Sequence, residues 1–532
     1  MSNPPPVATD PVVVVGAGPA GQTTALLLAR WGVPATIVDQ RPHRDRIGSR
    51  AICQQRDVLD IWEAVGAGRR ISEAGVTWDR ARTYYRDQEL ICQTFTGPGR
   101  SVFPPFVNIS QSDTEEILDE RIAATDLIRV RWSHEVTALD QDDHGVTVRC
   151  RTPDGDRTLR TPYVVACAGA RGDAVRHMLG LTFAGRSFDD HFLICDIRAD
   201  LGGWADERRF YFDPAWNPGR QVLIHPCPKS TFRIDWQVPP DFDLATERDS
   251  GALDRRIRQI IGDRAYEVVW SSVYRFHARR VDRMRVGRVL VAGDLAHLVA
   301  PFGARGLNSG VADVENAAWK IAFVLRGWAP PEILDSYHLE RTAAADENLA
   351  VTSATMDFLV PQTEPARQRR RSVLQRALTD PAARAEVDSG RLAEPFWYVD
   401  SPLTTPHPDR VFPGRPPRGR TPPVVPGVLV PDVPVTVGGR PAVTRLRQLV
   451  RDGLLVLTSG GATAARGTGA PVRALAIADI DPTGLLAEAF EPGPDDAFVV
   501  RPDGHVAAVA DAGDGDAVAA AVRRALGVAG VR

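Results

Sequence analysis

The sequence predicts an α/β fold in three parts: a parallel sheet covered by helices, an antiparallel sheet inserted into that domain, and a small C-terminal α/β domain. Apolar runs alternate with helical segments in the first part, strand-like alternation replaces helical spacing within it, and a Pro- and Gly-dense stretch, 404–434, precedes the last part. The expected boundaries are a flexible tail at 1–10, a first domain at 11–180 and 274–400, an inserted sheet domain at 181–273, a linker at 401–426 and a last domain at 427–532.

The composition is that of an ordinary globular protein. Of 532 residues 43% are hydrophobic and 25% charged, with a formal net charge of -3. This balance gives no reason to expect a nucleic-acid partner. The six cysteines form no CxxC pair and no cluster with histidine at metal spacing, so we expect reduced thiols and no metal. A secretory leader and an apolar run of membrane-spanning length are both missing from the sequence, which predicts a cytoplasmic protein without a membrane partner.

The first domain opens with a β-α-β pattern that carries a dinucleotide fingerprint. A β-branched run at 12–15 meets the GxGxxG turn, a helix is expected at 22–31, and a second apolar run occupies 35–38. The turn consists of Gly16, Gly18, Pro19, Ala20 and Gly21. Its glycines allow a tight turn and close approach of the backbone to a pyrophosphate, while the helix start supplies N–H groups. Asp39 closes the second strand and is followed by Gln40; a carboxylate there can accept hydrogen bonds from a ribose. We therefore predict a Rossmann-type dinucleotide site.

The remaining expected elements follow in chain order. Helical spacing covers 51–66 and 112–124, and strands are expected at 146–151 and 158–165. In the inserted sheet, strands are expected at 210–212, 221–225 and 232–238, with almost no helix. A strand at 289–292, a helix at 310–326 and helical sequence to 391 come next, and the last domain shows strands at 454–457, 473–477 and 498–500 and a helix at 517–526.

A second motif follows the strand at 289–292. It begins with Gly293 and Asp294, and the run from Gly303 to Asn308 then leads into a helix. Small residues there would let a flat ring lie on the backbone, and helix N–H groups would stabilise negative charge on its edge. An ordinary strand-loop-helix corner with Asp294 as a helix cap is the structural alternative.

These motifs together resemble the group A flavoprotein aromatic hydroxylases, over roughly residues 11 to 390. The resemblance implies that FAD is the cofactor and that Asp294 binds its ribityl chain. It also implies that Pro301 and Gly303 lie near the flavin ring and that Gly306, Leu307 and Asn308 bind its pyrimidine edge. Arg50 matches an arginine that contacts the FAD phosphates, and Gln111 matches a glutamine that also touches FAD.

One position departs from the family pattern. The family's middle motif has an Asp-Gly pair associated with both FAD and NAD(P)H, and this chain has Ala168-Gly169. Alanine cannot accept a hydrogen bond, so we expect slow flavin reduction unless a neighbour such as Asp173 replaces the acid.

The last domain resembles the thioredoxin-like C-terminal domain of the longer family members, with 498–504 as its terminal strand motif. The chain has no cysteine beyond Cys227, which excludes disulfide exchange by this domain. We expect it to be structural or an assembly surface.

The function implied by the resemblance is aromatic hydroxylation. NAD(P)H would reduce FAD, oxygen would add at C4a, and the flavin C4a-hydroperoxide would deliver an electrophilic OH to a phenolic or polyketide-like ring. The expected partners are therefore an aromatic small molecule and O2, and a homodimer is compatible with the sequence. A flavoprotein dehydrogenase and a flavin-dependent halogenase on the same fold are the alternatives, although the sequence lacks a WxWxIP-like segment.

The inserted sheet should supply the substrate contacts. Tyr211, His225, Arg233 and Trp236 are the candidates. Each has a structural alternative: Trp236 as core, Arg233 on a solvated face, and His225 and Tyr211 as hydrogen-bonded residues of the sheet. His297 is read as structural. The sequence identifies no catalytic acid or base.

Overall fold

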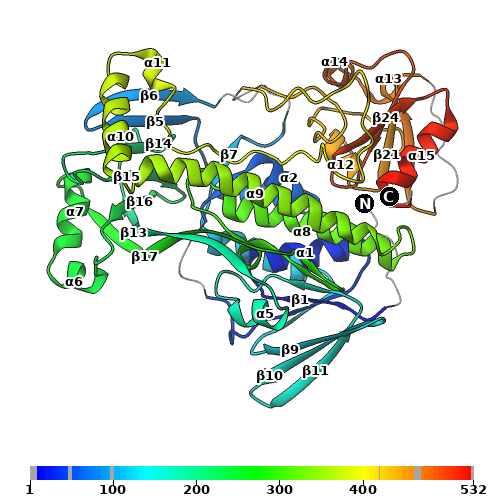
Figure 1. Cartoon of the computed structure of the whole chain (residues 1–532), viewed down its shortest axis with the longest axis horizontal. Helices are drawn as coiled ribbons and strands as arrows, with labels where there is room; N and C mark the ends of the chain where they lie inside the picture. The colour runs from blue at the N-terminus through cyan, green and yellow to red at the C-terminus, as the bar shows by residue number, and fades with distance from the viewer. Residues whose placement is uncertain (1–8, 46–50, 96–100, 418–419, 461–468, 529–532) are drawn as a thin grey trace.

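The computed structural model describes residues 9–45, 51–95, 101–417, 420–460 and 469–528. Two long helices, α8 (Arg305–Leu325) and α9 (Ile333–Leu359), run across the molecule and separate its parts (Figure 1). The parallel sheet lies on one side of them, the C-terminal domain lies at one end, and the large antiparallel sheet lies at the other. Within the described ranges, no helix is both long and apolar enough to cross a bilayer.

The parallel sheet has the order β18-β19-β12-β1-β2-β8. Its strands are β1 (Val12–Val15), β2 (Ala35–Val38), β8 (Ile128–Arg131), β12 (Val164–Ala166) and β19 (Val289–Val291), with β18 (Arg285–Val286) added antiparallel at the edge. The central strands are continuously apolar and buried, as expected for a sheet covered on both faces. The predicted β-α-β unit at the N-terminus is confirmed.

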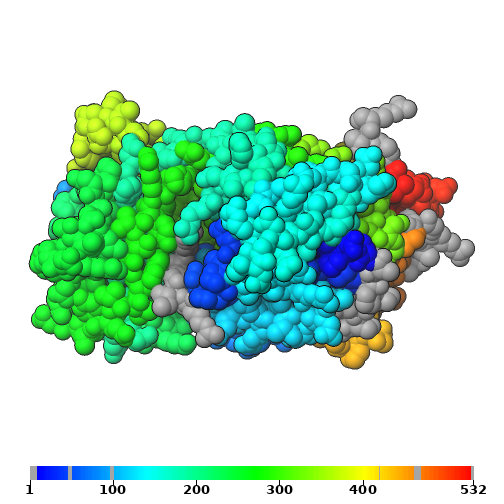
Figure 2. All heavy atoms as spheres, turned by 90° about the horizontal axis from the view of Figure 1, so that it is seen from below, coloured from blue at the N-terminus to red at the C-terminus, as the bar shows by residue number. Residues whose placement is uncertain are grey.

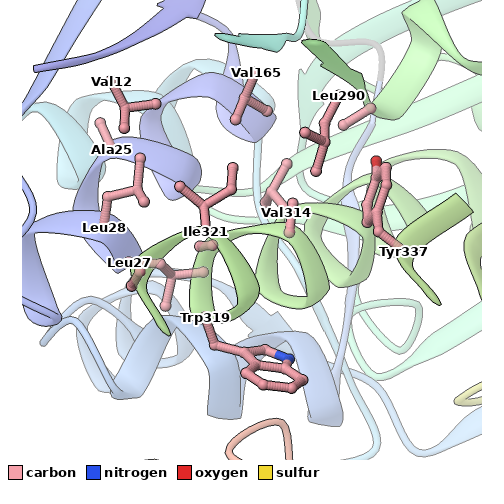
Figure 3. Packing of buried hydrophobic residues seen from close by; sticks show 14 of the residues in the cluster. Val12, Ala25, Leu27, Leu28, Val165, Leu290, Val314, Trp319, Ile321 and Tyr337 are labelled. Carbon is pink, nitrogen blue, oxygen red and sulfur yellow. The ribbon is translucent and has the colours of Figure 1, made fainter. Parts of the chain in front are cut away.

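Helices α1 (Pro19–Arg30), α4 (Gln111–Ala123) and α8 build the layers on this sheet. Figure 3 shows Leu27 of α1 and Ile321 of α8 meeting beneath Val12, Val165 and Leu290 of the strands. The predicted helix at 310–326 begins earlier, at Arg305. Its first turn contains Gly306, Asn308 and Ser309 and so lacks the apolar periodicity by which the rest was recognised.

The antiparallel sheet has eight strands in the order β20-β17-β13-β16-β15-β14-β5-β6. The strands at 183–281 are β13 (Phe183–Ala199), β14 (Glu207–Phe212), β15 (Gln221–Cys227), β16 (Thr231–Val238) and β17 (Tyr266–Val281); β5 (Arg80–Tyr85), β6 (Gln88–Thr94) and β20 (His297–Leu298) come from outside that segment. The expectation that 181–273 forms this sheet alone is therefore wrong. β5 joins in parallel beside β14, a pairing between segments too distant in the chain to be read from local pattern.

The expectation of almost no helix in 181–273 is also wrong. Two short helices, α6 (Leu244–Asp249) and α7 (Ala252–Ile261), cover one face of the sheet. In α7, Leu253, Ile257 and Ile261 recur every four residues and are buried against the sheet. Charged residues occupy most positions between them, and these three buried apolar side chains gave too weak a signal.

Two further segments differ from the sequence expectation. The predicted helical segment 51–66 begins as β3 (Cys53–Gln55), and only α2 (Arg56–Glu63) is helical; β3 pairs with β7 (Phe106–Asn108), which also pairs with β4 (Val76–Thr77). The single strand expected at 158–165 is two strands, β11 (Gly155–Thr161) and β12, in different sheets. β11 forms a three-stranded sheet with β9 (Glu135–Asp142) and β10 (Gly145–Thr152). The remaining helices of this part are α3 (Gly68–Ala74), α5 (Asp173–Met178), α10 (Glu364–Ala377) and α11 (Pro381–Arg384).

The C-terminal domain has a four-stranded sheet in the order β22-β21-β23-β24 and its own apolar core. Its elements are α12 (Leu446–Val450), β21 (Leu454–Thr458), β22 (Val472–Ala476), α13 (Ile477–Ile480), α14 (Leu485–Phe490), β23 (Asp496–Val500), β24 (Val506–Asp511) and α15 (Gly515–Ala525). The preceding segment 401–426 has no helix or strand in its described part, but it is packed against this domain. Leu403 is buried, and the Thr405 N–H donates to the Ala507 carbonyl at 2.7 Å.

Buried ions hold the C-terminal domain to the rest of the chain. The Glu340 carboxylate of α9 accepts hydrogen bonds from the Arg501 guanidinium at 2.5 and 3.0 Å and from the Lys320 ammonium at 2.7 Å. All three side chains are at most 1% exposed. Burial disfavours the ionised Glu340, but Arg501 and Lys320 outweigh burial and hold the pKa of that carboxyl well below its usual range. Asp503 gives Arg501 a second carboxylate partner and accepts from the Trp319 indole N–H at 3.1 Å.

We expect Arg501→Met to destabilise the folded chain by about 3–5 kcal/mol, because it leaves the Glu340 and Asp503 carboxylates buried with fewer counter-ions. Chemical denaturation followed by fluorescence measures the loss. The control is Arg367→Met, which breaks an ion pair between side chains that are 47% and 52% exposed and should change stability by under about 1 kcal/mol. Equal effects of the two substitutions would contradict the conclusion that the buried contact between Arg501 and Glu340 holds the C-terminal domain to the rest of the chain.

Candidate active site

A single cavity of about 650 Å³ lies between the carboxyl ends of the parallel strands and one face of the antiparallel sheet. Its lining includes the glycine-rich turn after β1, the segment after β19 and side chains of β13, β15, β16 and β17. Seen from below in Figure 2, the cyan sheet β9–β11 lies beside the green strands and helices of the antiparallel sheet. Because the glycine-rich turn and the segment after β19 line the same cavity as the antiparallel sheet, the fold brings the two halves of the predicted site into one space.

The turn after β1 is shaped by three glycines with different tasks. Gly16 has φ +103°, and a Cβ there would lie 2.4 Å from the Cys167 carbonyl oxygen. A Cβ on Gly21 would lie 1.9 Å from the Gly16 carbonyl oxygen, so this glycine allows α1 to pack on the turn. Gly18 instead lines the cavity, and a Cβ there would meet nothing within 4 Å. Pro19 opens α1, whose first N–H groups have no partner within the helix and are suited to an anion.

Asp39 lies at the end of β2 and lines the cavity beside Gln40. Its carboxylate accepts from the Ala17 N–H at 2.8 Å and from the Arg41 guanidinium at 2.9 and 3.0 Å. Burial favours the neutral acid, but the Arg41 and Ala17 hydrogen bonds outweigh burial and lower the pKa of Asp39. The group is therefore ionised at neutral pH and is held against the glycine turn as a hydrogen-bond acceptor.

Asp294 follows β19 and faces the same cavity from the opposite side. Gly293, with φ +62°, turns the chain there, and its N–H donates to the buried Asp313 carboxylate at 3.0 Å. The same carboxylate lies 2.7 Å from the His297 ring nitrogen, so His297 is a buried structural residue, as expected from the sequence. These contacts fix the loop that presents Asp294.

The start of α8 completes this end of the cavity. Ala304, in the left-handed region with φ +57°, precedes the helix, and Gly306 and Leu307 in its first turn line the cavity with Pro301 and Gly303. A Cβ on Gly303 would lie 2.1 Å from the Arg391 carbonyl oxygen.

The Asn308 side chain forms hydrogen bonds to β3. It accepts from the Gln55 N–H at 2.9 Å and donates to the Cys53 carbonyl at 3.0 Å, and so ties α8 to β3. It does not line the cavity; only its backbone could serve the pyrimidine edge.

Most predicted cofactor residues meet in this cavity. Those that line it are Gly16, Gly18, Pro19, Ala20, Asp39, Gln40, Gln111, Asp294, Pro301, Gly303, Gly306 and Leu307. Gly21 acts through packing and Asn308 through the β3 contact. Arg50 lies outside the described residues.

The predicted substrate residues divide between the two faces of the antiparallel sheet. His225 and Arg233 line the cavity. Trp236 and Tyr211 pack in the apolar cluster on the opposite face, beneath α7, so their prediction as substrate contacts is wrong. Because side chains alternate along a strand, Arg233 and Trp236, three residues apart, cannot share a face.

The same alternation identifies residues that the sequence analysis missed. Asp235 is two residues from Arg233 on β16 and faces the cavity, and Arg208 on β14 does so too. Aromatic and apolar side chains form the remaining wall: Phe192, Ile194, Leu223, Trp270, Tyr274, Phe276 and Phe302. Phe192 stacks on Phe276 with ring centroids 4.4 Å apart. This half of the cavity is therefore a chamber suited to a flat apolar molecule.

Ala168 lines the cavity next to the glycine turn. Asp173, considered above as a replacement for the missing acid, begins α5 with its side chain 88% exposed and paired with Arg176. It does not line the cavity. Its side chain is therefore a poor substitute for an acid at position 168.

Among the described residues, no group of three or more His, Cys, Asp or Glu side chains is placed to hold a metal ion. All six cysteines are unpaired in the structure.

Comparison with known proteins identifies the family. The model of the FAD binding domain matches residues 9–352, and the model of the aromatic-ring hydroxylase C-terminal domain matches residues 424–529. This chain belongs to the group A flavoprotein hydroxylases. The family assignment confirms the resemblance inferred from the motifs, and with it FAD as the cofactor.

Three proteins illustrate the similarity of this hydroxylase-family chain. The 3-(3-hydroxy-phenyl)propionate/3-hydroxycinnamic acid hydroxylase of Comamonas testosteroni is 29% identical over 68% of this chain and 61% of its own length. The dialkyldecalin synthase of Streptomyces rugosporus is 29% identical over 94% of this chain and 96% of its own. The crystal structure of the flavin-dependent monooxygenase PieE with FAD and substrate has a TM-score of 0.84 at 25% identity, covering 98% of this chain and 100% of that one.

The residues of the hydroxylase-family cavity fit an FAD molecule. Gly18 leaves space where a side chain would stand, and the first turns of α1 and α8 both face this space. One helix end suits the pyrophosphate and the other the electron-rich edge of the flavin. Asp39 lies against the turn before α1, and Asp294 lies in the segment that packs on α8, so each helix start has a carboxylate of the same cavity near it.

We expect Gly18→Val to fold but to purify without FAD, because its backbone, with φ -78°, accepts any residue while the new side chain enters the cavity. Flavin absorbance per protein and circular dichroism measure the two effects. The control is Gly438→Val, at an exposed glycine where a Cβ also meets nothing within 4 Å. A yellow Gly18→Val protein with normal FAD content would contradict the placement of the cofactor.

Proposed function

We propose that this chain is an FAD-dependent monooxygenase that uses NAD(P)H and O2 to hydroxylate an aromatic, phenolic or polyketide-like, small molecule. The observation that carries the proposal is the single cavity, in which the dinucleotide residues open directly onto an aromatic-walled chamber. The named activities of the hydroxylase and monooxygenase relatives support it. The match to the first of these relatives covers 61% of that protein's length, so the proposed activity rests on the site of this chain.

The chain's own residues would position the reactants. FAD, when bound, supplies the exchange of electrons with NAD(P)H and the activation of O2. The α1 end and Asp39 would hold its adenosine diphosphate half, while Asp294 and the first turn of α8 would hold its ribityl and ring portions. Phe192, Phe276 and the other apolar wall residues would bind the substrate ring and exclude water.

The finer domain assignments also belong to this proposal. The large antiparallel sheet would be the substrate domain, extended by β5 and β6 beyond the sequence boundaries. The C-terminal domain would be a thioredoxin-like unit, supported by its strand order with β21 parallel to β22 and antiparallel to β23. Its role would be structural, because no cysteine follows Cys227. A cytoplasmic location and a homodimer remain predictions.

A second candidate is a synthase that uses the same FAD-loaded cavity without hydroxylation. Two observations favour it: the match to the dialkyldecalin synthase extends over nearly the full length of both chains, and Ala168 replaces the acid of the Asp-Gly pair. Anaerobic mixing with NADPH or NADH separates the candidates. A monooxygenase reduces its flavin and then consumes O2 in the presence of substrate, whereas a synthase of this kind needs neither step.

We expect Ala168→Asp to speed anaerobic flavin reduction by NAD(P)H, because the restored carboxylate can orient the nicotinamide or the flavin beside the glycine turn. Stopped-flow absorbance measures the rate, and FAD content should stay unchanged. Ala168→Asn is the control for side-chain size without charge. Fast reduction in the natural protein, unaltered by Ala168→Asp, would show that the acid is dispensable.

A further inference from the structure

Arg208 is a buried cation that forms no ion pair, although the Asp235 carboxylate is near enough to act on its charge. It lies on β14 with 6% of its surface exposed and lines the cavity. Among the described residues its guanidinium has no ion pair and its Nε has no hydrogen-bond partner; the nearest recorded ring contact is Phe210, whose centroid is 5.9 Å away. Arg233, on the same face, is by contrast bound by Asp196 through two hydrogen bonds of 2.7 and 2.9 Å. A buried charge without a partner is costly, and a ligand that supplies the missing anion removes that cost.

Asp235 and His225 lie on neighbouring strands beside this cation. The pairing of β15 with β16 places His225 next to Arg233 and Leu223 next to Asp235. The His225 Nε2 and Asp235 Oδ2 atoms are 3.7 Å apart, too far for a hydrogen bond. The other atom of each group, His225 Nδ1 and Asp235 Oδ1, is buried and has no hydrogen-bond partner. The pair thus has unused polar atoms in a cavity with apolar walls.

Burial leaves Asp235 able to take a proton near neutral pH. Burial raises its pKa to about 7; Arg233 and Arg208 oppose this and Asp196 adds to it. Burial, with Arg208 and Arg233, lowers the pKa of His225 well below its usual value, so the imidazole is neutral. Cys53 and Cys227 also adjoin this group, and burial raises the pKa of each thiol to about 12, which keeps both uncharged. Tyr274 of β17 lines the same cavity.

We propose that Arg208 and Asp235 form the binding site for one acidic hydroxyl of the substrate, with Arg208 holding the oxyanion and Asp235 receiving its proton. His225 is a positioning residue that offers the hydroxyl a neutral hydrogen-bonding neighbour. The O–H bond breaks with its electron pair left on oxygen, and the proton passes to the Asp235 carboxylate, so one negative charge remains beside Arg208 throughout. The inference rests on the proposed function, because an ionised ring oxygen makes an aromatic ring more electron-rich.

A phenolic hydroxyl fits this arrangement better than a carboxylate. A phenol, with a pKa of about 10, enters neutral and can transfer its proton to Asp235. A carboxylate, with a pKa of about 4, enters already ionised and meets the negative charge of Asp235. It could bind Arg208 only if Asp235 also took a proton from solvent. The two ligand types therefore differ in the protons they exchange.

Calorimetric titration of the FAD-loaded protein tests the site. p-Cresol and 3-phenylpropionate are the probes, each titrated at pH 8 in two buffers of different ionisation enthalpy, which reports the protons exchanged on binding. We expect p-cresol to bind the natural protein with almost no proton exchange and 3-phenylpropionate to bind more weakly, with uptake of close to one proton. With Asp235→Asn, p-cresol should release close to one proton. Its Kd should then fall about tenfold per pH unit below the phenol pKa, as the phenolate fraction rises.

Arg208→Met should weaken p-cresol binding at least tenfold, abolish proton release in combination with Asp235→Asn, and leave FAD content unchanged. Because it removes a buried unpaired charge, the substitution should not lower the thermal unfolding temperature. The matched control is Arg209→Met, at the adjacent residue of β14, whose side chain points to the opposite face and pairs with Glu207. It should bind p-cresol normally.

Three outcomes would overturn the proposal: no p-cresol binding to the natural protein, normal binding to Arg208→Met, or the same proton exchange with and without Asp235→Asn. The binding tests need neither NAD(P)H nor O2. A chain that binds p-cresol as described but consumes no oxygen would therefore refute the monooxygenase function while supporting the hydroxyl site.

Discussion

The ion pair between Asp313 and Arg341 is the interaction on which the cofactor side of the molecule depends. The Asp313 side chain is fully buried and accepts from Arg341 at 2.7 Å, from His297 at 2.7 Å and from the Gly293 N–H at 3.0 Å. Burial raises the pKa of this carboxyl, but His297 and Arg341 outweigh burial and lower it to about 2. One carboxylate thus fixes α8, α9 and the loop that carries Asp294 relative to one another.

The preceding residue of α9, Glu340, extends this framework to the C-terminal domain. Arg341 points to Asp313, whereas Glu340, one position earlier on the helix, points to Arg501. Successive residues on a helix lie about 100° apart, so a single helix can make both contacts without sharing a side chain. The C-terminal domain is therefore attached to the helix that also supports the loop carrying Asp294.

The polar groups of the cavity divide into two sets with different electrostatics. At the dinucleotide end, Asp39 is already paired with Arg41 and Ala17, and the helix ends provide fixed partial positive charge. At the substrate end, Arg208 and Asp235 are buried with unused hydrogen-bonding capacity. The first set already has its polar partners, as a resident cofactor would require, and under the proposed hydroxyl site a ligand that enters and leaves would complete the second.

The sequence by itself determined the parts of the protein whose chemistry is local. The GxGxxG turn, Asp39 at the end of the second strand, and the Gly293–Asp294 corner could be read in order because a tight turn at a helix start requires particular residues at fixed spacing. FAD followed from the family resemblance that these motifs carry, and the three-part organisation followed from the helical and strand-like spacing and the Pro- and Gly-dense stretch. The start of α8 and the short α7 were missed or misplaced, because few residues there carry an apolar period.

Only the tertiary structure decided which side chains meet in the substrate chamber. The alternation along β16 could have paired Asp235 with Arg233 and set Trp236 apart, but it could not show which face was the cavity. Arg208 comes from a strand that joins β5, more than a hundred residues earlier in the chain, and its Nε has no hydrogen-bond partner only because of how the neighbouring strands are placed. Burial and pairing of charges are properties of the assembled sheet, and no local pattern of residue types encodes them.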